Sequence, residues 1–245
     1  MKRDYTIKHA GDCGVTVEFE NIISECVNQQ VIQLKIALEQ AAIKGMGEMI
    51  PTYRALLIQY NPLMLPYKEL ETGIVKAMDC MEDVTSQSSK VYIIPVYYGE
   101  AYGPDLGTVA KHNGISEEEV IQIHTSRDYR IYMLGFTPGF PYLGGMDARI
   151  ETPRLEKPRT KIDAGSVGIA GAQTGIYPID SPGGWQIIGR TPLKLFDRDK
   201  PNPILLEAGA YIRFKPVGLK VYAAIAADVE KGTYVPETVL TKGEA

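Results

Sequence analysis

Apolar residues in the first third of the chain follow two periods, and each period predicts one kind of element. Alternate apolar positions at 15–19 are typical of a half-buried strand, whereas spacings of three and four residues are typical of an amphipathic helix. Ser24 is a candidate N-cap for the first such helix, and Gly45 is a stop signal. In order, the pattern predicts a strand at 15–19, a helix over 27–38, extended segments within 49–60, a helix over 66–78 and a strand at 91–98. This order is that of a split βαβ sandwich.

The pattern changes between residues 135 and 192. This stretch holds 11 of the 24 glycines and 7 of the 16 prolines, a density that excludes helices and favours short strands between turns. Before it, Ser116 and Glu119 form a capping box for a short helix. After it, apolar runs predict strands at 193–196, 204–206, 211–214 and 221–225. Many short strands favour a closed or nearly closed barrel. The tail beyond Lys231 is predicted to dock through Tyr234 and Val235.

The composition is that of a globular protein and narrows the class of function. The 245 residues include 26 Lys and Arg and 30 Asp and Glu, and the acidic excess lies in residues 1–89. A net charge of −4 gives no sign of the overall basic surface that nucleic-acid-binding proteins use. No apolar run approaches the roughly 18 residues of a membrane span, and the first residues do not form a signal peptide. Cys13, Cys26 and Cys80, an odd number without a CxxC pair, predict a reducing cytoplasmic location.

Several common chemistries lack their motif. The sequence has no GxxxxGK(S/T) loop for nucleotide phosphates, no HExxH metal site and no GxSxG nucleophile elbow. His9, His112 and His124 are scattered without partners at metal-ligand spacing, so we expect no metal site. His124 and Asp128, four residues apart, are predicted to pair on a helix surface. An enzyme with this sequence would therefore take most of its cofactor machinery from other subunits.

The stretch rich in glycine and proline carries the candidate chemistry. Arg159 and Arg190 lie in rigid polar turns, where a guanidinium either clamps a carboxylate or phosphate or forms a structural ion pair. Residues 164–178 bring hydroxyls, an amide and backbone N–H groups close together, as in an anion nest. The candidate donors are the side chains of Ser166, Gln173 and Thr174 and the amides of Gly165 and Gly168. The three side chains could equally satisfy backbone groups at strand ends.

Aromatic residues concentrate in the same stretch. Phe136, Phe140 and Tyr142 alternate with glycine and with prolines such as Pro138, and Trp185 is the only tryptophan. Proline fixes the geometry of a turn, so it can hold neighbouring aromatic rings at a binding surface. The same rings are also common at barrel corners and in cores. We keep both roles open, a contact with a partner and a part of the barrel core.

Four strings in this stretch are long and specific. They are GFTPGFPYL, PRLEKPR, AGSVGIAGAQTGIYP and SPGGWQIIGRTP. With them, the chain resembles the family that joins the B subunit of bacterial ATP-dependent 5-oxoprolinase, the KipI-type inhibitor of a sporulation histidine kinase, and subunit 1 of allophanate hydrolase and urea carboxylase. The resemblance implies an α+β protein with a ferredoxin-like domain over 1–89 and a cyclophilin-like β-barrel over 90–245. The tail after about residue 234 is expected to be peripheral.

The resemblance also implies an activity and partners. The chain would be part of a complex that hydrolyses 5-oxo-L-proline to L-glutamate as ATP becomes ADP and phosphate, with ATP bound here or on another subunit. Its partners would be the A and C subunits of 5-oxoprolinase, the latter of the allophanate hydrolase subunit 2 type. We assign anion binding to Arg159 and Arg190 with Gly165 and Gly168. The remaining assignments are catalytic donors at Ser166, Gln173 and Thr174, an orienting role for Tyr177, and partner contacts at Phe136, Pro138, Phe140, Tyr142 and Trp185.

Two other functions stay open. A KipI-type regulator would bind the helical dimerisation region of a histidine kinase, with the aromatic loop at 136–142 as its contact. A part of allophanate hydrolase or urea carboxylase is the third alternative, although the chain lacks biotin-carrier and amidase motifs. A cyclophilin-like barrel does not by itself imply prolyl isomerase activity.

Overall fold

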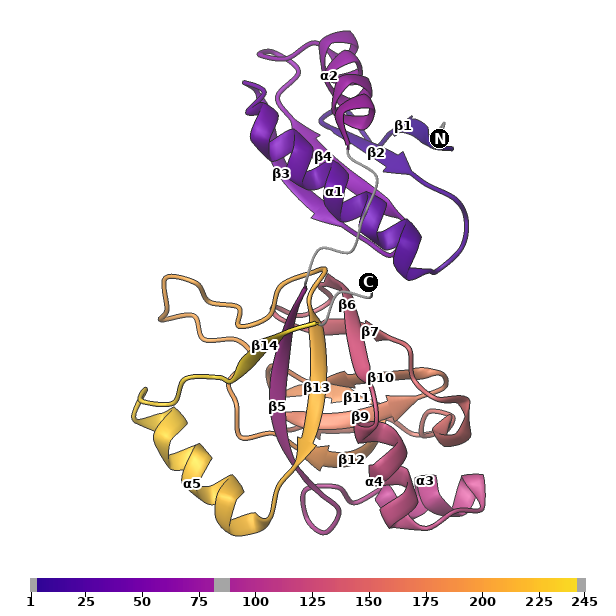
Figure 1. Ribbon diagram of the computed structural model, residues 1–245, viewed down its shortest axis with the longest axis vertical. Coiled ribbons are helices and arrows are strands. Elements are labelled where there is room, and N and C mark those ends of the chain that lie inside the picture. The colour runs from indigo at the N-terminus through magenta and orange to yellow at the C-terminus, as the bar shows by residue number, and fades with distance from the viewer. Residues whose placement is uncertain (1–3, 82–88, 242–245) are drawn as a thin grey trace. The chain divides into compact units, whose positions relative to one another are not determined.

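The alternating strand predicted at 15–19 becomes a central strand of a four-stranded antiparallel sheet with two helices packed against it (Figure 1). The apolar side chains of the two central strands, such as Val15 and Leu56, pack against the helical stripe that includes Leu34 and Leu70. Ser24 caps the first helix by accepting a hydrogen bond from the Val27 N–H. The elements are β1 (Thr6–His9), β2 (Gly14–Glu18), α1 (Glu25–Ala41), β3 (Met46–Pro51), β4 (Ala55–Tyr60) and α2 (Tyr67–Cys80). The computed structural model describes residues 4–81 and 89–241.

The set of strands in this sheet differs from the prediction. The order is β1-β2-β4-β3, and β1, which the sequence pattern did not predict, pairs with β2 as a hairpin. The run at 91–98 was expected to complete this set, and that prediction is wrong, because the run lies in the second unit of the chain, which begins at residue 88. Its side chains are buried on both faces, so it needs a sheet covered on both sides. The ferredoxin-like assignment of the first unit stays a prediction.

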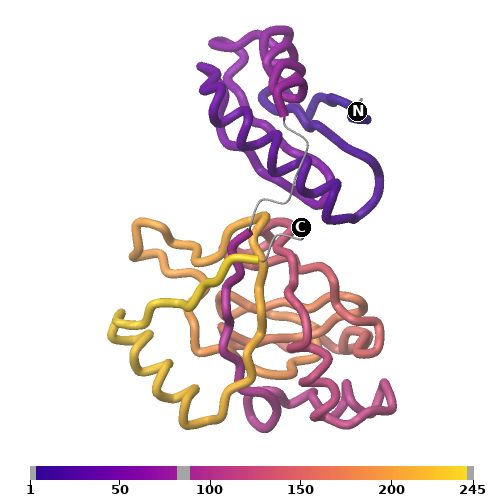
Figure 2. Tube along the Cα trace, in the orientation of Figure 1, coloured from indigo at the N-terminus to yellow at the C-terminus, as the bar shows by residue number. Residues whose placement is uncertain are grey.

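The second unit is a nearly closed, barrel-like sheet. Its strands follow the order β10-β9-β12-β5-β13-β6-β7, and the two ends of this path, β7 and β10, lie against each other. Strands β5 and β13, far apart in sequence, run parallel side by side (Figure 2). The strands are β5 (Lys90–Tyr98), β6 (Asp128–Leu134), β7 (Pro141–Gly144), β8 (Arg159–Ile162), β9 (Ser166–Ala170), β10 (Gln173–Ile176), β11 (Ser181–Gly183), β12 (Gln186–Arg190), β13 (Tyr211–Pro216) and β14 (Thr238–Leu240). This architecture is consistent with the expected cyclophilin-like barrel.

Helices complete the second unit and enclose its core. They are α3 (Leu106–Asn113), α4 (Glu117–Thr125), the 3-10 turn η1 (Ala148–Ile150) and α5 (Leu219–Glu230). The capping box at Ser116 and Glu119 is confirmed, with both reciprocal hydrogen bonds present at the start of α4. One apolar core links α3 and α4 to the inside of the barrel through residues such as Val109, Val120 and Ile169.

Three predictions for the end of the chain are wrong. Residues 221–225 form part of helix α5 rather than a strand, because a run of alanines around Tyr222 favours helix where only one face is buried. The segments at 193–196 and 204–206 contribute only an isolated bridge between Phe196 and Ile204. In the tail, β14 pairs with β5 while its own side chains stay exposed. The predicted docking of Tyr234 on the core is confirmed, and that of Val235 is wrong because Val235 is exposed.

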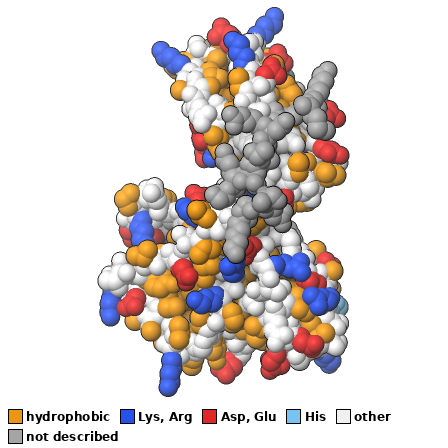
Figure 3. All heavy atoms as spheres, viewed as in Figure 1, with side chains coloured by type: hydrophobic (Ala, Val, Ile, Leu, Met, Phe, Trp, Pro, Cys, Tyr) orange, Lys and Arg blue, Asp and Glu red, His pale blue; other side chains and the backbone are white. Residues whose placement is uncertain are grey.

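The described surface has no single-sign charged face in the view of Figure 3, where basic and acidic side chains are interspersed. No helix in residues 4–81 and 89–241 is long and apolar enough to cross a membrane. Within the same residues, no three His, Cys, Asp or Glu side chains are grouped so that they could hold a metal ion. Candidate chemistry is therefore best sought in local clusters of side chains.

Candidate functional site

A cavity of about 200 Å³ lies on the second unit, and residues from separate segments of the glycine-rich stretch surround it. One segment precedes and enters β7, another spans β10 and the turn after it, and a third connects β11 to β12. The lining residues are Phe136, Phe140, Tyr142, Arg154, Gln173, Tyr177, Pro182, Gly183, Gly184 and Trp185. Six of the predicted site residues therefore meet at one place.

Aromatic rings form the walls of this cavity. Phe140 is 5% exposed, and its ring centroid lies 5.3 Å from Tyr142, 5.9 Å from Tyr177 and 5.7 Å from Trp185. All of these contacts are edge-to-face, as is that between Tyr177 and Trp185 at 6.0 Å. Each such pair contributes about 0.5–1.5 kcal/mol beyond its buried area. The walls are thus fixed by their mutual packing.

Glycine is required where these rings lie against the strands. A Cβ at Gly183 would lie 2.4 Å from the Tyr177 hydroxyl oxygen, and a Cβ at Gly175 would lie 3.0 Å from the Trp185 ring. Larger residues at either position would displace a ring of the cavity wall. The density of glycine in this stretch is therefore partly explained by the space that the rings need.

Phe136 stands at the cavity in a strained conformation. Its φ is 61°, in the left-handed region that bulky residues rarely adopt, and its side chain is 81% exposed. It touches the cavity wall through Phe140, with ring centroids 6.3 Å apart. Such a backbone costs on the order of 1–3 kcal/mol and is typical of functional sites. Pro138, predicted with it as a partner contact, is exposed and does not line the cavity.

Arg159 holds the backbone of the cavity wall. Its guanidinium makes an ion pair of 2.7 Å with Asp105 and donates to the Trp185 carbonyl at 3.3 Å. The Asp105 carboxylate also accepts a hydrogen bond of 2.6 Å from the Ile187 N–H, so Asp105 and Arg159 together hold the backbone at the start of β12. Asp105 is 10% exposed and the Arg159 side chain 32% exposed. Of the two roles weighed for Arg159, the ion pair is present, and anion binding stays a prediction.

Tyr177 and Trp185 are also joined directly. The backbone N–H of Trp185 donates to the Tyr177 hydroxyl, and this hydrogen bond lowers the pKa of the phenol, as does the charge of Arg154. Burial has the larger effect and raises the pKa of Tyr177 above its ordinary value. Tyr177 is therefore a neutral phenol at neutral pH, able to donate a hydrogen bond.

Among the described residues that line the cavity, Arg154 is the only charged one. Its side chain is exposed, and no carboxylate in the described part of the chain lies within ion-pair distance of it. Arg154 lies within the PRLEKPR string, and the sequence pattern predicts no role for it. Sequence spacing alone could not separate it from Arg159, because both lie beside prolines in the same basic string.

Arg190, the second predicted anion site, lies outside the cavity lining. Its Nε donates to the Ala164 carbonyl at 2.9 Å, and its Nη1 pairs with Asp163 at 3.2 Å. These contacts hold the turn before β9. The Gly165 amide in that turn donates to the Tyr177 carbonyl at 2.7 Å, so it is used within the sheet. Gly168 and Ser166 are buried strand residues of β9 that do not line the cavity.

Thr174 belongs to a buried polar network that the sequence did not reveal. His124 Nε2 lies 2.8 Å from the Thr174 hydroxyl, and Nδ1 lies 2.8 Å from the Tyr98 hydroxyl. Thr174 donates onward to the Gly168 carbonyl at 3.1 Å. Since its proton is used there, the hydrogen on the imidazole is assigned to Nε2, and Tyr98 donates to Nδ1. The Tyr98 hydroxyl, the two ring nitrogens of His124, the Thr174 hydroxyl and the Gly168 carbonyl therefore all have hydrogen-bond partners.

The expectation that His124 and Asp128 form a surface pair is wrong. His124 is fully buried and stacks on Phe214 with ring centroids 4.4 Å apart, whereas Asp128 pairs with Arg213 at 2.6 Å. Burial lowers the pKa of His124 to about 3, so the ring is neutral at physiological pH. No sequence pattern marked this histidine, because helical spacing does not tell a buried face from a solvated one.

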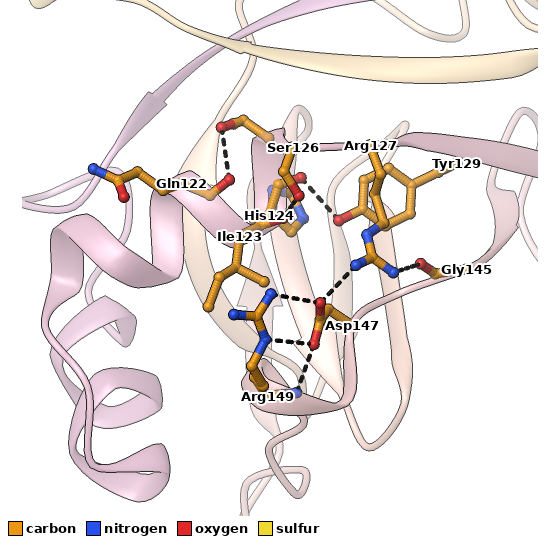
Figure 4. A network of polar contacts seen from close by, with 10 residues as sticks. Gln122, Ile123, His124, Ser126, Arg127, Tyr129, Gly145, Asp147 and Arg149 are labelled. Carbon is orange, nitrogen blue, oxygen red and sulfur yellow. Dashed lines mark hydrogen bonds and ion pairs between the residues drawn. The ribbon is translucent and has the colours of Figure 1, made fainter.

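A second basic cluster near α4 is structural as well (Figure 4). Asp147 accepts hydrogen bonds of 2.9 and 3.1 Å from Arg149 and also pairs with Arg127, which donates to the Gly145 carbonyl. Hydrogen bonding to Arg149 holds the pKa of Asp147 well below its usual range. Arg127 thus ties the start of β6 to the loop after β7, whereas Arg149 pairs with Asp147 within that loop, and neither arginine lines the cavity.

Known proteins resemble this chain along most of its length. A family model, "Carboxyltransferase domain, subdomain C and D", matches residues 5–206. The B subunit of 5-oxoprolinase from Bacillus subtilis is 44% identical, with 90% of this chain aligned to 96% of that protein. The corresponding protein of Escherichia coli O157:H7 is 53% identical over 52% of this chain and 59% of that protein.

The fold is also found in a much larger enzyme. The crystal structure of the Kluyveromyces lactis urea amidolyase superposes with a TM-score of 0.76 and 22% identity, covering 98% of this chain and 16% of the other. At this identity the similarity shows the shared fold alone. The family model and the identity to the Bacillus subtilis protein show more. The chain belongs to the family of carboxyltransferase domains, subdomains C and D, that includes the B subunit of 5-oxoprolinase.

Proposed function

We propose that this chain is the B subunit of an ATP-dependent 5-oxoprolinase, which hydrolyses 5-oxo-L-proline to L-glutamate as ATP becomes ADP and phosphate. The observation that carries the proposal is the 44% identity to a protein of this name over nearly its whole length. The A and C subunits would be its partners. The chain has no phosphate-binding loop, so we assign ATP binding to a partner.

The cavity supplies groups that the reaction needs. A lactam resists hydrolysis, and phosphoryl transfer from ATP to its amide oxygen would make the carbon electrophilic. The aromatic walls would exclude bulk water, and the Gln173 amide and the neutral Tyr177 phenol would donate hydrogen bonds to the charge that develops on the reacting group. Thr174 and Ser166 are given no catalytic role in this proposal, because they do not line the cavity.

Release of phosphate that depends on 5-oxoproline tests this proposal. This chain is mixed with the A and C subunits of 5-oxoprolinase from its own organism, and each of the three is left out in turn. We expect turnover to disappear when this chain is omitted. Equal turnover without it would contradict the proposal.

One observation favours a second candidate function. The strained, exposed Phe136 offers an apolar contact for a protein partner. A KipI-type regulator would use it to bind a histidine kinase. Autophosphorylation of a cognate kinase, measured with wild type and with Phe136→Ala, distinguishes the two. Inhibition by wild type but not by the variant, without 5-oxoproline turnover in any mixture, would favour the regulator.

A further inference from the structure

The cavity combines one cation with an otherwise uncharged lining. Among the described residues around it, Arg154 is the only charged side chain, and the rest are aromatic rings, glycines, one proline and one amide. A guanidinium can form two parallel hydrogen bonds with a carboxylate, which fixes the orientation of a ligand as well as its charge. The lining therefore matches a ligand with one negative charge and an otherwise compact, weakly polar body.

The neighbouring arginines cannot take this role without giving up contacts. Arg159 is held by Asp105 and the Trp185 carbonyl, and Arg190 is held by Asp163 and the Ala164 carbonyl. Arg154 has no such carboxylate partner within residues 4–81 and 89–241. Its charge is close enough to Tyr177 to lower the pKa of that phenol. Arg154 and Tyr177 both line the cavity, so the guanidinium and the phenol are available to the same ligand.

The volume of the cavity limits the size of the ligand. Sites for drug-sized molecules have volumes of about 300–1,000 Å³. A cavity of about 200 Å³ suits a smaller molecule, such as a single five-membered ring with one substituent. Rings packed edge-to-face present flat faces and positive edges to such a ligand.

From these features we infer that the cavity binds a small cyclic carboxylate, with the carboxylate on Arg154 and the ring against the aromatic wall that Phe140 and Trp185 form. The identity of the ligand as 5-oxoproline, a lactam carboxylate, rests on the proposed function. Arg154 is then the residue that selects the acid over an uncharged lactam. Gln173, which lines the same cavity, is placed to contact the amide group.

The only tryptophan of the chain lies in the cavity wall, so its emission is a direct probe of binding. The full chain is titrated with 5-oxo-L-proline and with pyrrolidin-2-one, the same lactam without the carboxylate. We expect a saturable change in Trp185 emission with the acid and affinity about 10- to 100-fold weaker for the uncharged lactam. Equal affinity for the two compounds would overturn the inference.

Variants of Arg154 sharpen the test. Arg154→Gln should weaken binding of the acid by about 10- to 100-fold and leave that of the uncharged lactam unchanged, and Arg154→Lys should be intermediate because it keeps the charge without the fork. Arg198→Gln is the matched control, since Arg198 is 85% exposed and lies outside the cavity. In the assembled complex, Arg154→Gln should raise KM by the same factor. Unchanged KM together with an unchanged titration, or with no fluorescence response, would overturn the inference.

The two proposals fail in different ways. If turnover requires this chain but Arg154→Gln keeps the wild-type KM, the proposed function stands and the carboxylate site is wrong. If no mixture turns over 5-oxoproline while the chain binds a cyclic carboxylate in a manner that depends on Arg154, the site stands and the proposed function is wrong.

Discussion

Gln173 and Thr174 are adjacent on β10, yet their side chains lie in two different regions. One region is a buried network of paired polar groups, and the other is a cavity that opens to solvent. Thr174 is 1% exposed and closes the core network in which Tyr98, His124 and the Gly168 carbonyl satisfy one another. Gln173 lines the aromatic cavity, where Arg154 has no carboxylate partner in the described residues and Phe136 adopts a strained backbone. Alternation along one strand separates the two regions.

The contrast indicates which polar groups serve the fold and which serve a ligand. A buried network is stable only when each donor and acceptor has a partner, and the His124 network meets this condition. An uncommitted cation beside rings fixed by their own packing is a poor contributor to folding and a suitable anchor for a ligand. Four changes test this contrast, from the largest expected effect to the smallest.

Replacing His124 by Ala should have the largest effect. The change opens a hole beside Phe214 and removes the partners of two buried hydroxyls, so we expect a loss of about 3–5 kcal/mol in the free energy of unfolding. Urea unfolding followed by Trp185 emission measures this loss in the second unit. His112→Ala is the matched control, because His112 is exposed on α3 and should cost within about 0.5 kcal/mol. Equal losses would contradict the structural role of the network.

Breaking the ion pair between Asp105 and Arg159, which holds the cavity wall, should lower the free energy of unfolding by a smaller amount. Asp105→Ala leaves Arg159 and the Ile187 N–H without their acceptor, and we expect a loss of about 2–3 kcal/mol with a shift in Trp185 emission. The expected cost is reduced because Arg159 is partly exposed. Asp128→Ala breaks a surface pair with Arg213 and should cost about 0–1 kcal/mol without a shift in emission. An unchanged emission in Asp105→Ala would show that the ion pair does not position Trp185.

Mild acid should weaken the fold through His124. Its folded pKa of about 3 lies below the ordinary value of 6.5, so the unfolded chain binds more protons between these limits and stability falls as pH falls. The loss approaches about 1.4 kcal/mol per pH unit below pH 6.5. The lowered pKa values of Asp147 and Asp180 act in the same direction but only at lower pH.

Unfolding by urea at pH 7, 6 and 5 measures this dependence. His124→Gln should flatten the slope between pH 6.5 and 5, and His112→Gln should keep it. A wild-type slope in His124→Gln would contradict the assignment of a neutral, buried imidazole.

Removing the strain at Phe136 should have the smallest effect on stability and the opposite sign. Phe136→Gly relieves a left-handed φ and should raise the free energy of unfolding by about 0.5–1 kcal/mol while lowering the turnover of the complex. Ala42→Gly, at a left-handed residue that caps α1, should give a similar gain with unchanged turnover. Full turnover in Phe136→Gly would show that this strain has no function.

Sequence patterns predicted those elements whose burial follows a simple period. The strand at 15–19 and the helices over 27–38 and 66–78 are present, because each has one apolar face on a core. The inclusion of 91–98 in the split βαβ order failed because a strand buried on both faces does not reveal which strands lie beside it. The run at 221–225 is too short and too uniformly apolar for its period to tell a strand from a helix, and its alanines together with packing of one face against β5 favour the helix.

The candidate site was located by composition but not resolved into roles. Glycine, proline and aromatic residues at 135–192 marked the stretch that surrounds the cavity, and six of the predicted residues line it. Preferring Arg154 to Arg159 as the cation for a ligand needed the position of Asp105, which pairs with Arg159 from more than fifty residues away in sequence. Thr174 and Gln173 could not be separated without knowing which face of β10 is inside the barrel.

The most direct test of the central claim compares these two neighbours in the assembled complex. We predict that Gln173→Ala lowers kcat/KM for 5-oxoproline by about 100-fold and costs less stability than Thr174→Val. Thr174→Val should lose about 1–3 kcal/mol of stability and keep the wild-type kcat/KM per folded molecule. The reverse result, with activity lost in Thr174→Val and retained in Gln173→Ala, would contradict the assignment of function to the aromatic cavity.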